Sequence, residues 1–275
     1  MSNKKIIVIY HGGGCLDGFG SAYIAWKQFG NDAEYIPAQY GNSPPDVKDK
    51  EVYIVDFSYP RDALLKMADE ASFIQVLDHH KTAQKDLEGL VCAKFDMNKS
   101  GIGMTWEYFN KDKKLPYSLA MIQDRDLWMF EIPDTKPFTL ALKSFIKETF
   151  IAWDGIVEYP KEQIYLIERG KDLIHVFNKD VEELVNKSHA MELSKACCMI
   201  VACNAMPKYA SELGNVLAKK HGLMAAIYFY DGSRKEWQFS LRSVGGFDVS
   251  AIAQVYGGGG HSNAAGFSVK SFGDL

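Results

Sequence analysis

The sequence lacks any apolar run long enough to cross a membrane. A membrane-spanning helix needs about 20 consecutive, mainly apolar residues, and no stretch of this chain approaches that length. The apolar run near the start, Ile6 to Tyr10, is also too short for a signal peptide. We therefore expect a soluble, cytoplasmic protein that does not bind membranes.

Cysteine is scarce and shows no disulfide pattern. The sequence has five cysteines, an odd number, and their spacing matches no known framework. We expect all of them to be reduced thiols, in agreement with a cytoplasmic location. They are Cys15, Cys92, Cys197, Cys198 and Cys203.

The chain also lacks an excess of positive charge. Its formal net charge is -4 over 275 residues, whereas proteins that coat nucleic acids favour strongly basic surfaces. This excludes general binding along a long polymer, but it is compatible with a small anionic substrate in a local pocket. Apolar residues make up 47%, which is ordinary for a globular protein of one large or two modest domains.

The first part of the chain alternates between strand and helix patterns. Residues 6–10 form a β-branched apolar run that ends at a Gly-rich turn, and a helical pattern follows over residues 18–29. Strand patterns at 51–57 and 73–77 enclose another helix, which predicts a parallel pair with a right-handed crossover. We therefore expect residues 1–145 to form an α/β domain with an open, mainly parallel sheet and helices on both faces.

The rest of the chain reads as a connector and a second domain. Residues 146–194 look mostly helical, with charged and apolar residues interleaved. Residues 195–275 begin with a strand-like run at 197–203 and contain a hairpin-type turn at Asp231-Gly232. We expect this last segment to be a smaller α/β substrate-binding domain.

Side chains that bind metals follow three of the predicted strands. In an open parallel sheet, the crevice outside the carboxyl ends of the strands is the usual ligand site. The fold should therefore bring these residues together although they are distant in sequence. They are His11 and Asp17 after the first strand, Asp56 after the second, and Asp78, His79 and His80 after the third.

An acidic pair, Asp124 and Asp126, follows a predicted helix and could complete this site. Imidazoles with several carboxylates suit manganese, magnesium or ferrous iron better than a structural zinc. A bridging carboxylate can hold two ions about 4 Å apart, which activate a water and hold the phosphoryl oxygens of an in-line displacement. Asp78 could instead accept a hydrogen bond from a ligating imidazole and fix its tautomer. The pattern predicts a metal-dependent phosphoesterase.

Each of these residues also has a purely structural explanation. His11 could cap a strand, and Asp56 could precede a helix that begins with proline. The Asp78-His79-His80 segment could be a solvated turn, and either Asp124 or Asp126 could pair with Arg125. The occurrence of such residues at successive strand ends favours the metal site.

A second cluster lies near the C-terminus. Four glycines, Gly257 to Gly260, precede His261, and glycine amides can approach an anion closely. Arg242 follows a strand and could bind a phosphate with two hydrogen bonds. The alternative is a flexible turn before a packed strand, but the small residues Ala264-Ala265-Gly266 favour a nearby ligand.

At this point the sequence resembles the DHH phosphoesterases, a family named after its Asp-His-His motif. The resemblance covers both ends of the chain. The motifs are His11 to Gly18, Val55 to Ser58, Asp78 to His80, Gln123 to Asp126, and Gly257 to Phe267, which is similar to the DHH-associated domain.

The resemblance implies a role for each of these residues. Two divalent ions, manganese first with magnesium or iron as alternatives, would be bound by His11, Asp17, Asp56, His79 and Asp124. The catalytic residues would be Asp56 as the bridging carboxylate, Asp78 as the orienting group, and His80 facing the scissile phosphate or its leaving group. The substrate would be bound by Arg242, His261, Gly258, Gly259, Gly260 and Asn204.

The first motif departs from the family at Cys15, where the family has an Asp. A thiolate is a softer ligand than a carboxylate, and a neutral thiol need not bind a metal. The first metal site is then weaker, selects a different ion, or is completed by water. Between Asp124 and Asp126, the motif position favours Asp124 as the ligand.

The function expected from these observations is hydrolysis of a phosphodiester in short nucleotide substrates by a metal-activated water. Substrates could be di- or oligonucleotides, including linear or cyclic dinucleotides, but not long nucleic acid. One alternative is a nucleotide phosphomonoesterase or a polyphosphate or pyrophosphate hydrolase. Another is a non-catalytic nucleotide-binding regulator, with Cys15 as the lesion. The sequence leaves monomer and homodimer open.

Overall fold

The structure is a computed structural model that describes residues 4–222 and 224–275. The chain divides into two compact units, Met1–Ile174 and His175–Leu275. The division falls inside the long helix α8 (Pro160–Val185). The segment 146–194, expected as a helical connector, therefore contributes to both units, and its last part forms a strand, β6 (His189–Leu193).

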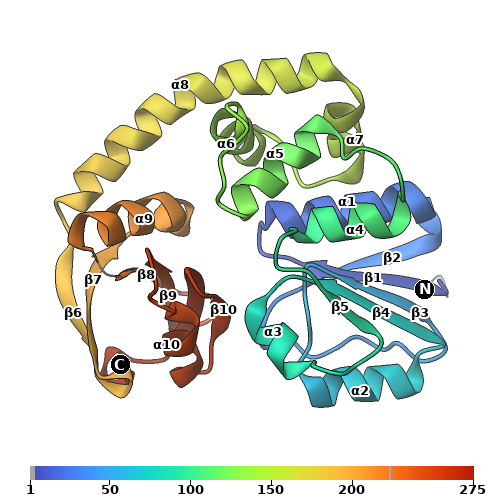
Figure 1. Cartoon of the computed structure of the whole chain (residues 1–275), viewed down its shortest axis with the longest axis horizontal. Helices are drawn as coiled ribbons and strands as arrows, with labels where there is room; N and C mark the ends of the chain where they lie inside the picture. The colour runs from blue at the N-terminus through green and yellow to red at the C-terminus, as the bar shows by residue number, and fades with distance from the viewer. Residues whose placement is uncertain (1–3, 223) are drawn as a thin grey trace. The chain divides into compact units, whose positions relative to one another are not determined.

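The first unit is built on a five-stranded parallel sheet in the order β2-β1-β3-β4-β5 (Figure 1). Its central strands are buried on both faces, which explains their continuous apolar runs. Val8, Ile9 and Ile54, for example, are fully buried. The strands are β1 (Ile6–His11), β2 (Ala33–Ala38), β3 (Glu51–Val55), β4 (Phe73–Asp78) and β5 (Ala93–Phe95).

Helices cover both faces of this sheet, as the sequence predicted (Figure 1). On one face, the helices α1 and α4 pack against the strands, and α5, α6 and α7 extend this layer around the buried Trp153. On the other face, α2 packs through Leu64 and Met67. The helices are α1 (Leu16–Phe29), α2 (Arg61–Glu70), α3 (Lys81–Asp86), α4 (Gly101–Phe109), α5 (Tyr117–Asp126), α6 (Thr135–Phe145) and α7 (Phe150–Glu158).

The strand order switches direction between β1 and β3. The chain leaves β1 toward β2 on one side, whereas β3 continues toward β4 on the other side. The loops at the carboxyl ends of β1 and β3 therefore diverge, which is the arrangement at which α/β proteins bind ligands. The edge strand β2 was not predicted, because its sequence contains a glutamate and Pro37, a residue that sheets tolerate only at edges and strand ends.

The second unit is a six-stranded mixed sheet in the order β10-β11-β9-β8-β7-β6. Only β7 and β8 pair in parallel, and the other pairs are antiparallel. One face packs on α9 (Ala210–His221), and the other packs on α10 (Val249–Val255). The expected smaller α/β domain is thus confirmed. Its remaining strands are β7 (Cys198–Asn204), β8 (Met224–Asp231), β9 (Glu236–Ser243), β10 (Gly259–His261) and β11 (Ala264–Val269).

Helix α8, with 26 residues, contributes to two cores. Leu166 and Ile167 pack in the core of the first unit, whereas Val181 packs with α9 in the second. Its sequence interleaves charged residues with these apolar ones. Among the described residues, no helix has both the length and the apolar character needed to span a bilayer.

Candidate metal centre

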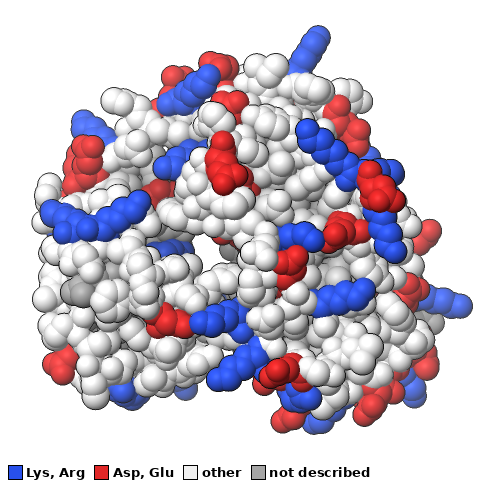
Figure 2. Space-filling model, viewed as in Figure 1, with Lys and Arg blue, Asp and Glu red and all other residues white. Residues whose placement is uncertain are grey.

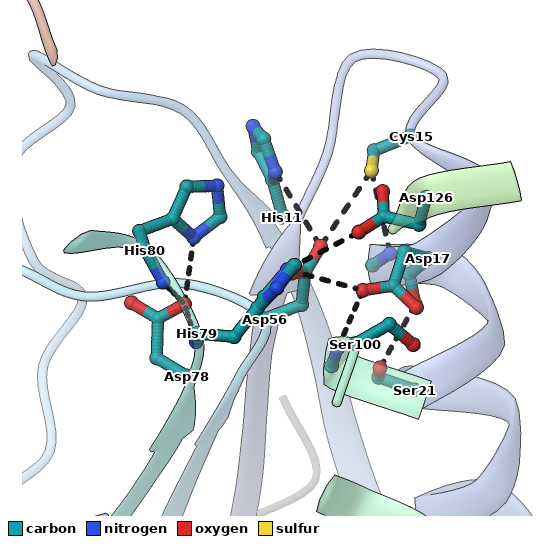
Figure 3. A network of polar contacts seen from close by, with 12 residues as sticks. His11, Cys15, Asp17, Ser21, Asp56, Asp78, His79, His80, Ser100 and Asp126 are labelled. Carbon is teal, nitrogen blue, oxygen red and sulfur yellow. Dashed lines mark hydrogen bonds and ion pairs between the residues drawn. The ribbon is translucent and has the colours of Figure 1, made fainter. Parts of the chain in front are cut away.

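The segment from the end of β1 to the first turn of α1 contributes three side chains to a polar network at the carboxyl end of the sheet (Figure 3). His11 is the last residue of β1, and Cys15 is the N-cap of α1, where its Sγ accepts a hydrogen bond from the Gly18 amide at 3.5 Å. Asp17 lies in the first turn of the helix and is 1% exposed. A Cβ atom at Gly18 would lie 2.1 Å from the His11 carbonyl oxygen. Only glycine lets the helix begin this close to the end of the strand.

Asp56 follows β3 in the left-handed backbone region, with φ of 54°. Asp is one of the few residues other than glycine that adopt this conformation at modest cost. Its backbone N–H donates to the Leu77 carbonyl oxygen at 2.9 Å, which ties the turn to β4. The buried carboxylate lies between the imidazoles of His11 and His79 (Figure 3). Strained backbone conformations of this kind cluster at functional sites.

Three carboxylates converge on the imidazole of His79. Its Nε2 lies 3.1 Å from Asp56 Oδ1, 3.5 Å from Asp17 Oδ2 and 3.4 Å from Asp126 Oδ2. Residues of α1 and α5 and residues that directly follow β3 and β4 thus meet at one point. The most distant of them in the sequence, Asp17 and Asp126, are 109 positions apart. Asp17, His79 and Asp126 form a group that could hold one metal ion.

The second oxygen of Asp56 faces a different set of donors. Asp56 Oδ2 lies 3.5 Å from His11 Nδ1 and 3.5 Å from Cys15 Sγ. His11, Cys15 and Asp56 form another group whose donor atoms lie within 4.8 Å of one another. The two oxygens of the Asp56 carboxylate thus face different donor sets, and if each set held a metal ion, Asp56 would contribute an oxygen to both.

The N-terminus of α4 binds the Asp17 carboxylate. The backbone amides of Gly101 and Ile102 donate to its two carboxylate oxygens at 2.6 and 3.0 Å. The positive end of a helix dipole stabilises a carboxylate in this place. A Cβ atom at Gly101 would lie 2.4 Å from Asp56 Cβ, so glycine is required there. The sequence analysis missed this role, although Ser100-Gly101 before a helical run is a recognisable N-terminal signal.

The charges at this centre fit a divalent cation. Burial and the neighbouring Asp56 and Asp126 raise the pKa of Asp17 well above its ordinary value. Burial opposes ionisation of Asp56 as well, but hydrogen bonds from His11 and His79 prevail and hold its pKa well below its ordinary value. Carboxylates packed this closely demand positive charge, which the imidazoles supply as protons when no ion is bound.

The pKa values of His11 and His79 are both raised by the neighbouring carboxylates. Burial alone would lower the pKa of His79, but Asp56 and Asp126 raise it to about 10. Burial likewise opposes protonation of His11, yet hydrogen bonds to Asp56 and Cys15 raise its pKa to about 11. The His11 Nδ1 atom is buried, and its contact with Asp56 Oδ2 is long for a hydrogen bond, at 3.5 Å. A metal ion would satisfy this nitrogen and replace the protons, so the donor set fits such an ion.

Asp78 orients His80, and donor atoms of Asp78, His80 and Asp56 lie within 4.8 Å of one another. Its Oδ1 accepts from His80 Nδ1 at 2.7 Å and from the His79 amide at 2.8 Å, and its Oδ2 accepts from Ser58 Oγ at 2.6 Å. Burial would raise the pKa of Asp78, but His80 and Ser58 hold it below its ordinary value. This network fixes the proton of His80 on Nδ1 and directs the ring through its other nitrogen.

The structure places Asp126, and not the expected ligand Asp124, in the group around His79. Its carboxylate accepts hydrogen bonds from the amides of Glu131 at 2.9 Å and Ile132 at 3.2 Å, and from the Thr135 hydroxyl. It therefore closes the turn after α5. Residues two apart on a helix do not share a face, so Asp126 is the one that reaches His79.

Tyr40, which the sequence analysis also missed, lies beside the centre. Its ring centroid is 5.8 Å from that of His11, 6.1 Å from that of His80 and 5.1 Å from that of Phe57. The side chain is 52% exposed. It follows the unpredicted strand β2, so no local signal marked it. Tyr40 therefore presents an aromatic ring next to His80.

In the second unit, the register of the sheet places two expected substrate-binding residues in one row. His261 pairs with Ala264, and Ala264 pairs with Arg242, so the two side chains share a face with a small residue between them. The guanidinium of Arg242 donates to Ser211 Oγ at 2.9 Å and to the Leu241 carbonyl oxygen at 2.8 Å. This row combines two cationic or donor groups suited to an anion.

The other expected substrate-binding residues have different positions. Asn204 lies on β7, three residues beyond the position of that strand that is level with Arg242, so its side chain is on the opposite face of the sheet. The Asn204 side-chain amide donates to the Tyr228 carbonyl oxygen at 3.1 Å. The sheet does not bring it to Arg242. A Cβ atom at Gly258 would lie 2.0 Å from the Gly266 carbonyl oxygen, Gly259 pairs with Gly266, and Gly260 has a φ of 138°. Close packing of β10 on β11 accounts for these glycines.

Comparisons with known proteins bear on both units. Residues 197–275 match the DHHA1 domain. The chain is 33% identical over 289 aligned positions to the uncharacterized protein R106 of Acanthamoeba polyphaga mimivirus, covering 95% of this chain and 67% of that protein. It is 25% identical to the oligoribonuclease NrnB of Bacillus subtilis, covering 92% and 71%. The crystal structure of RecJ from Thermus thermophilus in complex with Mn²⁺ shares its fold, with a TM-score of 0.52 at 13% identity, over 97% of this chain and 50% of RecJ.

Proposed function

Because the chain belongs to the DHH family of phosphoesterases, we propose that it hydrolyses the phosphodiester bond of short nucleotides, such as a linear dinucleotide, at a centre of two divalent ions. The position of Asp56 carries the proposal. Its two oxygens face two separate sets of donors, His11 with Cys15 and His79 with Asp17 and Asp126. A carboxylate between two such sets is the arrangement of binuclear phosphoesterases.

Manganese is the ion we propose first. Carboxylates and imidazoles suit it, and RecJ, which shares the fold, was solved with Mn²⁺. His11 and Asp56 would hold one ion, and Asp17, Asp56, His79 and Asp126 the other. When bound, such ions polarise the phosphoryl oxygens and lower the pKa of water toward neutrality.

His80 is the residue that we place at the leaving group. Asp78 holds the ring through Nδ1 at 2.7 Å, so Nε2 is the nitrogen left to face the departing oxygen, and the ring in its imidazolium form would donate the Nε2 proton there and become neutral. Asp78 is buried and is itself fixed by Ser58. An imidazole oriented by a buried carboxylate in this way keeps one tautomer and one direction during proton transfer.

Two observations favour a short substrate. Acidic and basic side chains are interspersed on the face of each unit drawn in Figure 2, whereas a long phosphate backbone is bound by a continuous basic stripe. The row of Arg242 and His261 instead provides a compact anion site that we propose for a single nucleotide phosphate. The name of NrnB, an oligoribonuclease, agrees with this substrate class.

The test compares a 5′-phosphorylated dinucleotide with a single strand of about 20 nucleotides, in Mn²⁺ and with chelator, and separates the products by chromatography. We expect metal-dependent release of mononucleotide, much faster from the dinucleotide. In Asp56→Ala this release should fall more than about 100-fold, because even the partners of metal ligands cost 10–100-fold when they are removed. Asp154→Asn, which alters a carboxylate bonded to Lys27 on the surface, is the matched control.

Other outcomes would overturn the proposal. Faster cleavage of the long strand would contradict the short-substrate class. Release of orthophosphate alone would identify a phosphomonoesterase or an anhydride hydrolase. Nucleotide binding without turnover under every divalent metal would identify a regulator.

A further inference from the structure

We propose that the sulfur of Cys15 is a metal ligand, and that it makes the site of His11, Cys15 and Asp56 selective for a thiophilic divalent ion such as Zn²⁺ or Co²⁺. The inference rests on the proposed function only in its premise that this centre holds metal ions. It concerns which ion the first site takes.

The two distances from Asp56 to the other donors match one coordination sphere. Asp56 Oδ2 lies 3.5 Å from Cys15 Sγ and 3.5 Å from His11 Nδ1, and all three donors lie within 4.8 Å of one another. Zinc binds sulfur at about 2.3 Å and nitrogen or oxygen at about 2.0–2.2 Å, so a tetrahedral ion spaces these donors about 3.3–3.7 Å apart. The observed separations from Asp56 fall in that interval without any movement of the chain.

The N-cap position alone does not explain a cysteine. Ser, Thr, Asp and Asn are the residues that cap helices best, and the Cys15 sulfur accepts from the Gly18 amide only at 3.5 Å. The same sulfur points at the Asp56 carboxylate (Figure 3). Cap geometry therefore fixes the direction of the sulfur, and the metal site gives a reason for the sulfur itself.

The remaining cysteines provide the contrast. Among the described residues, the groups able to hold a metal ion include Cys15 but neither Cys92, Cys197, Cys198 nor Cys203. The neighbouring group of Asp17, His79 and Asp126 contains only nitrogen and oxygen donors. Soft thiolate ligands favour zinc, whereas carboxylates with imidazole suit manganese or magnesium. The centre thus has one softer and one harder site, joined by Asp56.

Cobalt provides a readout that does not depend on activity. The metal-free protein would be titrated with Co²⁺ under anaerobic conditions. The absorption spectrum would be recorded for the thiolate-to-cobalt charge-transfer band and for the visible bands of bound cobalt. We expect the charge-transfer band in the wild type and in Cys92→Ser, which changes another partly buried thiol. It should vanish in Cys15→Ser and Cys15→Asp, while Cys15→Asp still binds cobalt through oxygen and nitrogen.

Competition between metals measures the selectivity. After equilibration with equal concentrations of Zn²⁺ and Mn²⁺, the ratio of bound zinc to bound manganese should fall at least tenfold in Cys15→Asp. Circular dichroism of each variant checks that it folds. The inference is overturned if wild-type protein binds cobalt without the charge-transfer band, binds no cobalt, keeps the band in Cys15→Ser, or shows the same metal ratio in Cys15→Asp.

Hydrolysis of the dinucleotide is assayed separately with Mn²⁺, Co²⁺ and Zn²⁺, each alone and in pairs. A protein that shows the cobalt–sulfur band but cleaves no dinucleotide would refute the proposed function and leave the assignment of Cys15 intact. A protein that cleaves the dinucleotide but lacks the band would do the reverse.

Discussion

Asp124 and Asp126 are two positions apart on one helix, but their carboxylates have different partners. The Asp124 carboxylate is surrounded by the amides of Glu131 and Ile132, and the Asp126 carboxylate approaches His79. Motif position favoured Asp124, but the direction of each side chain depends on the rotation of α5, which the motif does not contain. The helix turns by about 100° per residue, so two residues two apart point in widely different directions.

This division of roles gives a matched pair of variants. Asp126→Asn should weaken binding of the ion at Asp17, His79 and Asp126 more than about tenfold, since losing a partner of a metal ligand already costs 10–100-fold in affinity. The melting temperature of the metal-free protein should stay nearly unchanged. Asp124→Asn should destabilise the fold by about 1–3 kcal/mol, because it disturbs buried hydrogen bonds, with metal affinity largely retained. Isothermal titration and thermal melts measure both. Exchanged phenotypes would restore Asp124 as the ligand.

Tyr40 leads to a second prediction at this scale. An exposed ring beside His80 can stack on a nucleobase, and such stacking is worth about 1–3 kcal/mol. Tyr40→Ala should lower kcat/KM for a dinucleotide about 5- to 100-fold, mainly through KM, whereas Tyr40→Phe keeps the ring and should retain most of the activity. Steady-state kinetics on a dinucleotide and on a phosphodiester without bases separate the two. Equal losses on both substrates would contradict stacking.

At the level of elements, the ends of parallel strands explain why much of the candidate site could be predicted. β1, β3 and β4 are mainly apolar, so their ends could be recognised in the sequence, and a parallel sheet places these ends at one edge. The structure brings together His11, Asp17, Asp56 and His79 for that reason. β2 escaped prediction because an edge strand may contain polar residues and proline, and Tyr40 was missed with it.

The start of α4 supplies the prediction at this scale. A Cβ atom at Gly101 would collide with Asp56 Cβ at 2.4 Å and with Asp17 Oδ2 at 2.9 Å. Gly101→Ala should therefore destabilise the protein by about 1–3 kcal/mol, as overpacking does, and reduce hydrolysis strongly because two ligands move. In Gly155→Ala on α7, a Cβ atom would meet nothing within 4 Å. This control should gain about 0.5–1 kcal/mol. Thermal melts and kcat/KM of both variants provide the measurement, and unchanged hydrolysis in Gly101→Ala would contradict the close approach.

For the whole molecule, metal binding is coupled to proton release. In the metal-free protein the pKa of His11 is raised to about 11 and that of His79 to about 10, mainly by Asp56 against the effect of burial. Both rings are therefore protonated at pH 7 and must lose a proton to bind an ion. Metal affinity should rise with pH, by up to about tenfold per pH unit for each proton displaced. Calorimetric titrations in buffers of different ionisation enthalpy count the protons, and an enthalpy independent of the buffer would contradict this coupling.

The division of the chain into two units sets where a metal ion stabilises it. The side chains assigned as ligands all lie in the unit Met1–Ile174, on β1, α1, α5 and the ends of β3 and β4. An ion at 100 times its dissociation constant adds about 2.7 kcal/mol to the stability of the state that binds it. Hydrogen exchange in Mn²⁺ should therefore slow in β1, β3 and β4, whereas β7, β8 and β9 exchange as they do with chelator. Slowing of equal size in both sheets would mean that the units unfold as one, and slowing confined to the second sheet would place the metal centre elsewhere.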